Sequence, residues 1–235
     1  MRVKLQPAFI LHSRPYKDSS QILDILTAEY GRLSVVAKGS RRRQKGGSSA
    51  AVLQPFIPLL LSFSGNGELK TVTGSEVAGS PCTPSGARLF SGLYLNELLV
   101  RLLHRHDPHP SLFLAYSKAM GGLKSSGEVD EVLRSFEFTL LQELGFGFDL
   151  STDGSNGQAI SPENWYRYDH LHGLVQDNQP NSQERPLFAG SDLLIMATGE
   201  FGAQVKISSK RLLRQVLASH LGDVPLKSRD LFRRS

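Results

Sequence analysis

The hydrophobic pattern of the sequence changes near residue 82, and this change constrains the fold more than any other feature. Before it, apolar and β-branched residues gather in short runs bounded by glycine, proline and serine, as strands do. The five runs are 8–13, 20–27, 33–38, 58–64 and 69–77. Gly65-Asn66-Gly67 separates the last two runs, and glycine and asparagine accept the positive φ of a hairpin turn. The sequence therefore predicts five β-strands in its N-terminal part.

The order of these runs favours a small barrel. Three consecutive strands, a connector and two further strands are the layout of an OB-fold barrel. A small SH3-like barrel or an open meander is the alternative, because hydrophobic periodicity does not separate these folds. We expect the barrel to form a domain of residues 1–80.

Beyond Pro81 and Pro84, apolar residues recur every three or four positions, which is the spacing of amphipathic helices. The predicted elements are helices at 85–106, 111–123 (ended by Gly121-Gly122), 128–144, 191–197 and 206–221, with a small hairpin at 165–168 and 171–175. The predicted fold class is thus α+β, an N-terminal five-stranded OB-fold barrel followed by a mainly α-helical domain of residues 81–235.

Composition limits the classes of protein that fit. Hydrophobic residues make up 40% of the 235 residues and charged residues 21%, which suits a folded chain rather than a disordered one. The single cysteine, Cys82, excludes an internal disulfide and a multi-cysteine zinc site. The longest apolar run, 56–63, is interrupted by Pro58 and is far shorter than the roughly 18 residues of a membrane helix. Residues 1–7 hold two charges and no apolar segment follows them, so we expect no signal peptide and a cytoplasmic protein.

The net charge of +5 is unevenly distributed along the chain. Residues 1–80 carry +6 and residues 206–235 carry +6, whereas residues 81–205 carry −7. Two basic ends that flank an acidic middle predict two surfaces able to attract a polyanion.

The densest group of cations follows the third predicted strand. Its members, together with one arginine a strand-length upstream, are Arg32, Lys38, Arg41, Arg42, Arg43 and Lys45. Guanidinium groups on a Gly/Ser-rich loop can bind phosphates, with an affinity that depends on salt and little on sequence. We therefore predict nucleic-acid binding by these six residues on one barrel surface; a merely solvated loop is the alternative. Aromatic side chains on which bases could stack are Phe9, Tyr16, Tyr30, Phe56 and Phe63.

A second basic group lies toward the C-terminus. It comprises Lys210, Arg211, Arg214, Lys227 and Arg229. These cations would extend the phosphate track or receive an acidic peptide from a partner protein. A solvated helix face is an equally good interpretation of the sequence.

Signatures of catalysis are absent from the sequence, which has no GxxxxGK[ST], HExxH or GxSxG motif. His104, His106 and His109 have a spacing that could hold a metal, but a helix C-terminus also favours histidine. Asp149 and Asp153 fit turns. We expect no enzyme, no cofactor and no metal. The competing hypotheses are an RNA- or ribosome-associated OB protein, a nuclease that uses Asp149 or Asp153, and a scaffold that joins only proteins.

Six stretches together resemble the RecO family of bacterial DNA repair and recombination mediators. They are AFILHSRPY at 8–16, GRLSVVAKGSR at 31–41, LQPFIPLLL at 53–61, SGLYLNELL at 91–99, RSFEFTLLQELGFG at 134–147 and PLKSRDLF at 225–232. The resemblance implies binding of single- and double-stranded DNA and annealing of complementary strands. It also implies work in the RecF pathway with RecR, contact with the acidic, hydrophobic-ended tail of the single-stranded DNA-binding protein SSB, and indirect loading of RecA. The implied location is the bacterial cytoplasm, at the nucleoid.

The resemblance also assigns roles to residues. It makes the six barrel cations phosphate contacts, and it makes Arg134 and the basic C-terminal segment candidates for the terminal carboxylate of the SSB tail. Many relatives carry a four-cysteine zinc site in the helical domain, but residues 145–180 contain no cysteine here. The chain is therefore similar to the zinc-less members, and we expect packing alone to hold this domain together.

Overall fold

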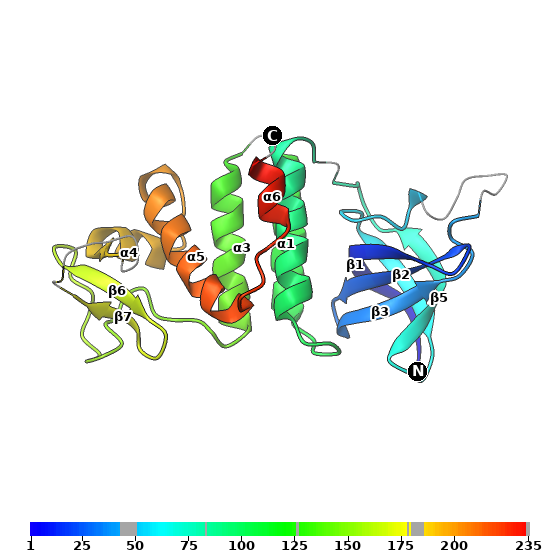
Figure 1. The fold of residues 1–235 in the computed structure, drawn as a ribbon, viewed down its shortest axis with the longest axis horizontal. Helices are drawn as coiled ribbons and strands as arrows, with labels where there is room; N and C mark the ends of the chain where they lie inside the picture. The colour runs from blue at the N-terminus through cyan, green and yellow to red at the C-terminus, as the bar shows by residue number, and fades with distance from the viewer. Residues whose placement is uncertain (43–50, 83, 126, 178, 180–185, 234–235) are drawn as a thin grey trace. The chain divides into compact units, whose positions relative to one another are not determined.

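The computed structural model describes residues 1–42, 51–82, 84–125, 127–177, 179 and 186–233. Its contacts divide the chain into two compact units. The first unit comprises residues 1–126 and 226–235, and the second comprises residues 127–225 (Figure 1). The C-terminal residues thus belong to the same unit as the N-terminal barrel.

Five strands close into a barrel in the first unit. They are β1 (Arg2–Tyr16), β2 (Ser20–Thr27), β3 (Gly31–Ala37), β4 (Leu59–Ser64) and β5 (Leu69–Val77). Their order around the barrel is β1-β2-β3-β5-β4, and β4 pairs back onto β1. An open meander would place β4 beside β3, but β5 lies there instead and runs parallel to it. The predicted five-stranded barrel and the α+β class are therefore confirmed.

Strand β1 is much longer than the predicted run 8–13, because it pairs with two different strands. Its first half pairs with β4 and its second half with β2. The register shifts between Val3 and Gln6 and again between Ile10 and His12, as expected where a strand bends to close a barrel. These irregularities break the alternation of apolar and polar residues, so hydrophobic periodicity reveals only the centre of the strand.

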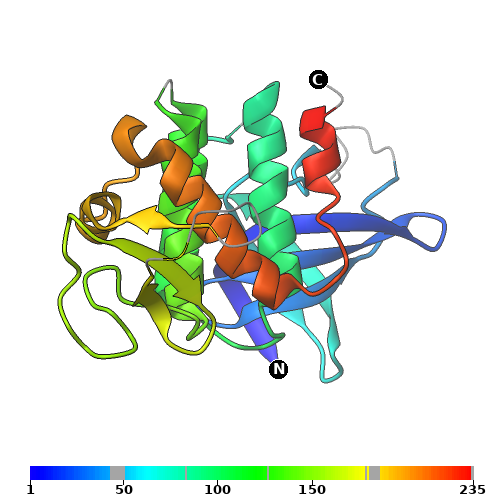
Figure 2. The same ribbon diagram turned by 60° about the vertical axis from the view of Figure 1, so that its left-hand side comes forward.

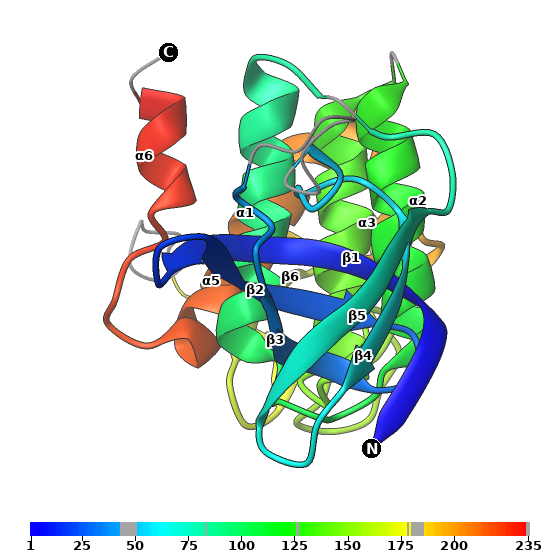
Figure 3. The same ribbon diagram turned by 90° about the vertical axis from the view of Figure 1, so that its right-hand side faces the viewer.

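The barrel has an apolar interior and an outer wall that is also largely buried. Its interior is formed by Val3, Ala8, Ile10, Leu23, Ile25, Leu33, Val35, Ala37, Leu53, Leu59, Leu61 and Phe63. On the outside, helices α1 (Ala87–Leu102) and α2 (Pro110–Lys124) cover β1 (Figure 3). The ring of Phe9 packs 5.5 Å from Phe113 and 5.0 Å from Tyr116, measured between centroids. Asn96 Nδ2 donates to the Leu11 carbonyl (2.9 Å) and its Oδ1 accepts from the Tyr116 hydroxyl (2.6 Å).

Helix α2 continues through Gly121-Gly122, where the sequence predicted its end. A glycine inside a helix costs roughly 0.5–1 kcal/mol relative to alanine. Packing outweighs this cost, because Met120 and Leu123 on either side are buried. Cys82 Sγ also donates to the Met120 carbonyl at 3.1 Å. The predicted bounds 111–123 are correct to within one residue, but the two glycines do not end the helix, because tertiary contacts override their local propensity.

A short helix, α6 (Ser228–Arg233), returns the end of the chain to α1. The carboxylate of Glu97 on α1 accepts hydrogen bonds from the backbone N–H of Lys227 (2.9 Å) and Ser228 (2.8 Å), and from the Ser228 hydroxyl (2.6 Å). Leu226 is buried, and Phe232 packs edge-on against Phe90. Glu97 therefore caps the first turn of α6 from another helix.

The second unit combines three helices with a small sheet (Figure 2). Its elements are α3 (Val129–Glu143), β6 (Trp165–Asp169), β7 (Gly173–Gln176), β8 (Phe188–Ala189), α4 (Gly190–Ala197), a 3₁₀ turn (Ala203–Val205) and α5 (Lys206–Leu221). Helix α5 packs against α3, and the sheet has the order β7-β6-β8. The predicted hairpin is confirmed as β6 and β7. In the described part of the chain, no helix has the length and apolar character needed to cross a membrane.

Candidate nucleic-acid interface

The start of the cationic loop lies beside the turn between β1 and β2. The N–H of Arg41 donates to the Ser19 carbonyl (2.9 Å), and the N–H of Gly39 donates to Ser20 Oγ (3.4 Å). The exposed cations gathered at this end of the barrel are Arg14, Lys17, Lys38, Arg41 and Arg42, which we call the loop-end cations. One exposed carboxylate, Asp18, lies in the same turn. The predicted residues Arg43 and Lys45 lie outside the described part of the chain.

The backbone after β3 holds the first two arginines of the loop in a defined turn. Gly39 has a φ of +65°, which reverses the chain directly after Lys38. The buried hydroxyl of Ser40 donates to the Ala37 carbonyl (3.0 Å), and the Arg42 N–H donates to the Gly39 carbonyl (3.0 Å). Arg41 and Arg42 are therefore presented from an ordered turn, with their side chains in solvent.

Two of the loop-end cations, Arg14 and Lys17, were not predicted from the sequence. The signal was available in the strand pattern. In three consecutive antiparallel strands, the end of the first strand and the end of the third strand lie at the same end of the sheet. Tyr16 pairs with Ser20, and Gln21 pairs with Ala37, so three successive strands bring residues 14–17 next to residue 38. Pairing within the barrel thus enlarges the cationic surface beyond the run seen in the sequence.

One of the five candidate aromatic residues lies with these cations. Phe9, Phe56 and Phe63 are buried in the unit and cannot stack on a base. Tyr30 is partly buried and packs edge-on against Phe63. Tyr16 is partly exposed in the β1–β2 hairpin, where the Lys17 ammonium lies 5.5 Å from its ring centroid. Tyr16 is the aromatic residue best placed for stacking beside phosphate-binding cations.

Arg32 does not lie with the loop-end cations. It begins β3 while Lys38 follows that strand, so a rise of about 3.3 Å per residue separates them by roughly 20 Å. Arg32 Nε donates to the Leu103 carbonyl at the end of α1 (3.2 Å). The structure therefore divides the predicted site between the two ends of β3.

The cations of α5 are partly engaged by carboxylates of α3. Lys206 Nζ lies 2.9 Å from Asp130 Oδ2 and 3.7 Å from Glu128 Oε2, and Lys210 Nζ lies 3.9 Å from Asp130 Oδ1. Partial burial raises the pKa of Asp130, but the hydrogen bond from Lys206 and the charge of Lys210 outweigh this effect and lower it overall. Arg211 is partly buried and Arg214 is exposed.

Arg134 is not a surface cation. Its side chain is 6% exposed, and its Nη2 lies 2.9 Å from Oε1 of Glu137, whose side chain is fully buried. Arg134 was a candidate contact for the terminal carboxylate of the SSB tail, whereas the structure shows it in a buried ion pair with a residue one helical turn away. Lys227 and Arg229, also predicted as partner contacts, lie at the start of α6 in the first unit.

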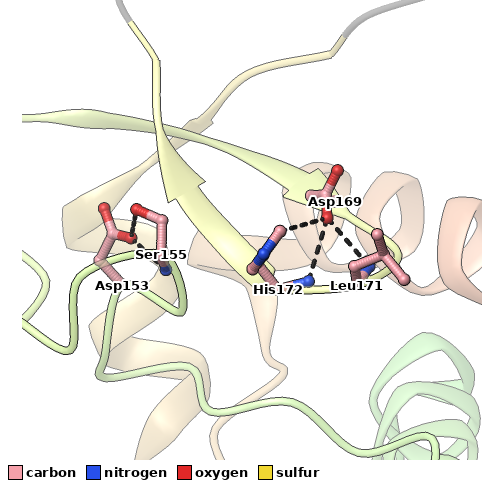
Figure 4. A network of polar contacts seen from close by, with 5 residues as sticks. All are labelled: Asp153, Ser155, Asp169, Leu171 and His172. Carbon is pink, nitrogen blue, oxygen red and sulfur yellow. Dashed lines mark hydrogen bonds and ion pairs between the residues drawn. The ribbon is translucent and has the colours of Figure 1, made fainter.

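The two aspartates considered for catalysis are engaged in turns. Asp149 Oδ1 accepts from the N–H (2.8 Å) and hydroxyl (2.6 Å) of Ser151. The carboxylate of Asp153 accepts from the N–H and hydroxyl of Ser155 (Figure 4). It also accepts from the N–H of Gln176. Partial burial raises the pKa of Asp153, but these donors outweigh it and lower the pKa overall. Among the described residues, no three metal-ligating side chains converge.

The two units carry opposite net charges. The first unit holds 20 Lys and Arg residues against 8 Asp and Glu, a net charge of +12. The second unit holds 7 against 14, a net charge of −7. The barrel and the helices packed on it therefore form the part of the molecule that attracts a polyanion.

A closed five-stranded barrel with cationic loops is the architecture of OB-type domains, many of which bind nucleic acids. The family model "Recombination protein O N terminal" matches residues 1–81, and "Recombination protein O C terminal" matches residues 84–230. The chain belongs to the RecO family, whose named members are DNA repair proteins.

Individual relatives match along their whole length. The DNA repair protein RecO of Methylococcus capsulatus is 43% identical over 235 residues, covering 100% of this chain and 95% of the relative. Proteins of the same name from Pseudomonas aeruginosa and Haemophilus influenzae are 44% and 41% identical, covering 97% and 99% of this chain and 94% and 97% of the relative. The family predicted from the six sequence stretches is therefore confirmed.

Proposed function

We propose that the protein binds single- and double-stranded DNA through its first unit and anneals complementary strands. The observation that carries this proposal is the set of loop-end cations, which are exposed and have no carboxylate within ion-pair distance among the described residues. Cations of this kind bind phosphates and release counterions, which favours binding to any sequence. The net charge of +12 on the first unit adds a long-range attraction.

Annealing requires no bond chemistry from the protein. Two polyanionic strands repel each other, and a cationic surface that binds both reduces this repulsion until bases can pair. The engaged turns around Asp149 and Asp153 give no support to a nuclease. The proposed role is therefore binding and assembly rather than catalysis.

The substitution of Arg41 and Arg42 by alanine tests this proposal. We expect the double variant to bind single-stranded DNA about tenfold more weakly at low salt. The plot of log affinity against log salt should become shallower by about 0.7 for each phosphate that the variant no longer neutralises. Lys118→Ala, which removes an exposed cation from α2, is the matched control. An affinity and slope equal to the control would show that the loop does not bind DNA.

A competition between DNA and RNA of equal length separates the proposal from an RNA-binding role. Stronger binding of single-stranded DNA, and faster pairing of complementary DNA strands in the presence of the protein, would support the proposal. A clear preference for RNA without annealing would support the RNA- or ribosome-associated alternative.

We further propose that α5 receives the acidic tail of SSB. Ile207 is 83% exposed, and Lys210 and Arg214 follow it at three and seven positions, on one side of the helix. An acidic peptide with a hydrophobic end fits such a stripe of one apolar and two cationic residues. Arg214→Glu should weaken binding of the tail peptide, while Arg134 is unsuited to this contact because it is buried.

The roles with RecR and in loading RecA rest on the family and on the tail contact. In this proposal the protein acts on DNA coated by SSB, and hence in the bacterial cytoplasm at the nucleoid. Loss of RecA loading in the Arg214→Glu variant, with DNA affinity unchanged, would separate partner recruitment from DNA binding. Residues 1–80 and 81–235 remain the proposed DNA-binding and partner-binding domains, except that residues 81–126 and 226–235 belong to the same compact unit as the barrel and share in its proposed DNA binding.

A further inference from the structure

The segment between α1 and α2 is fixed against the start of β3. Arg32 and Arg105 pair as a single parallel β-bridge, and the His106 N–H donates to the Arg32 carbonyl (2.9 Å). Arg32 Nε in turn donates to the Leu103 carbonyl (3.2 Å). A Cβ atom on Gly31 would lie 2.0 Å from the Asp107 carbonyl oxygen, so the two backbones are in close contact. We call this contact the β3 corner.

The β3 corner holds cationic and titratable side chains in solvent. Arg105 is exposed, as are His104 and His106, and Arg32 is partly exposed. His106 has a φ of +60°, a conformation that costs a non-glycine residue energy and that the backbone contacts impose. The sequence marked these histidines as unusual, but neither a metal site nor the proposed loop contact uses them.

Two arginines are paired through their backbones at the corner, and neither has a bound carboxylate in the described part of the chain. Among the described residues, no carboxylate oxygen is within ion-pair distance of Arg32 or Arg105. Burial lowers the pKa of Arg32, Asp24 opposes this effect, and the charge of Arg105 lowers the pKa further. The two positive charges therefore repel each other, although the backbone bridge keeps the two residues adjacent.

The neighbouring carboxylates have other partners. Asp24 Oδ1 accepts from Ser34 Oγ (2.6 Å), and Asp24 Oδ2 lies 4.0 Å from His12 Nδ1. Asp107 Oδ2 lies 3.3 Å from His109 Nε2. An external anion that bound between Arg32 and Arg105 would relieve their repulsion and form charge-assisted hydrogen bonds with both.

We propose that the β3 corner is a second phosphate-binding site for the polynucleotide that the loop-end cations bind. This inference rests on the proposed DNA-binding function and extends it to the opposite end of β3. The two ends are roughly 20 Å apart, and a single OB barrel commonly binds about 4–16 nucleotides. One strand can therefore contact both ends, with Arg105, His104 and His106 as contacts supplied from outside the barrel.

Substitutions at Arg105 test the site, since its side chain is exposed and its bridge uses only the backbone. We expect Arg105→Ala to weaken binding of a single strand of about 16 nucleotides by roughly three- to tenfold. The salt dependence should become shallower by about 0.7, Arg105→Glu should have a larger effect, and Arg105→Lys should restore most of the affinity. Lys118→Ala is again the matched control, and circular dichroism of each variant checks the fold.

Oligonucleotide length gives a second measurement. A strand of about 4 nucleotides can occupy the loop end alone, so Arg105→Ala should change its affinity much less than that of the longer strand. Inorganic phosphate is the small-anion probe. If phosphate binds in an Arg105-dependent way while DNA affinity does not depend on Arg105, the site binds free phosphate and the proposal is wrong.

The outcomes also separate this inference from the proposed function. If the unaltered protein binds no DNA, the proposed function itself is wrong. A second outcome is that the protein binds DNA and that Arg41→Ala with Arg42→Ala weakens this binding, while the Arg105 variants behave like Lys118→Ala. In that case only the proposed phosphate site at the β3 corner is wrong.

Discussion

The first unit of this protein holds 12 arginines and the second holds 5, and the two units also differ in how their arginines are paired. In the second unit, Arg134 is paired with Glu137 and Arg167 with Asp177. In the first unit, Arg41, Arg42 and Arg105 are exposed and have no carboxylate within ion-pair distance among the described residues. A cation paired within the protein has little attraction left for a ligand, whereas an unpaired one attracts phosphate. This difference in pairing supports nucleic-acid binding by the first unit more firmly than net charge alone does.

The largest effect should follow the loss of a paired cation in the second unit. Arg134→Met would leave the fully buried Glu137 without this ion pair, so we expect a loss of about 3–5 kcal/mol in the free energy of unfolding. Chemical denaturation measures it. The double variant Arg134→Met with Glu137→Leu is the control and should recover much of the stability. A single variant as stable as the unaltered protein would contradict the structural role of the pair.

The next effect sharpens the comparison within the first unit. Gly31 and Gly39 have nearly the same positive φ, +63° and +65°, but only Gly31 touches another backbone. Gly39→Ala should cost about 1–2 kcal/mol from its backbone conformation. Gly31→Ala should cost at least about 1 kcal/mol more, because its Cβ would collide with Asp107. Equal decreases in unfolding temperature in the two variants would show that the backbone contact between Gly31 and Asp107 does not constrain the β3 corner.

A smaller effect concerns the cap on α6. Partial burial raises the pKa of Glu97, but the hydrogen bonds from Ser228 and Lys227 and the charge of Arg101 outweigh it and lower the pKa overall. A lowered pKa contributes stability that is present above the ordinary glutamate value of about 4.3 and is lost as the pH falls through the folded value. The protection factor of the Ser228 amide, which is its exchange rate compared with the intrinsic rate at the same pH, should therefore fall in acid.

The same amide reports on a substitution. Glu97→Gln should speed exchange at Ser228 at neutral pH, by an amount that corresponds to about 1–2 kcal/mol. It should also remove the change in the protection factor of this amide between neutral and acidic solution. Persistence of that acid response in the variant would mean that a different carboxylate controls the end of the chain.

The smallest effect is expected at the surface pair between α5 and α3. Lys206→Ala removes an exposed ammonium whose pKa is raised by the hydrogen bond and the charge of Asp130. Solvent and salt screen such a pair, so the unfolding midpoint should change little and the change should vanish at high salt. A large, salt-independent loss would show that this pair resembles Arg134 and Glu137 rather than a surface contact.

Several elements could be located from the sequence, because their boundaries have local causes. Strand β2 and helix α5 begin and end at the predicted residues. A tight turn bounds β2 on both sides, and Gly222 with a φ of +67° ends α5. The ends of β1 were mispredicted for the opposite reason, because register shifts and pairing with two neighbouring strands determine them.

The candidate site was predicted less completely than the fold. The run of cations after β3 is visible as a cluster in the chain, but Arg14 and Lys17 join it only through strand pairing. Arg32 is near this run in sequence, yet a strand separates them in space. Arg134 has the polar character of a surface residue, and only the buried Glu137 one turn away explains its position.

The sequence by itself determined the class of fold, the family and the existence of a cationic surface, because hydrophobic spacing, turn residues and charge clusters are properties of neighbours in the chain. Only the tertiary structure decided which cations are free to meet a phosphate and which are paired or buried. The physical reason is that ion pairing and desolvation depend on residues distant in sequence, as with Arg105, which β3 holds beside Arg32.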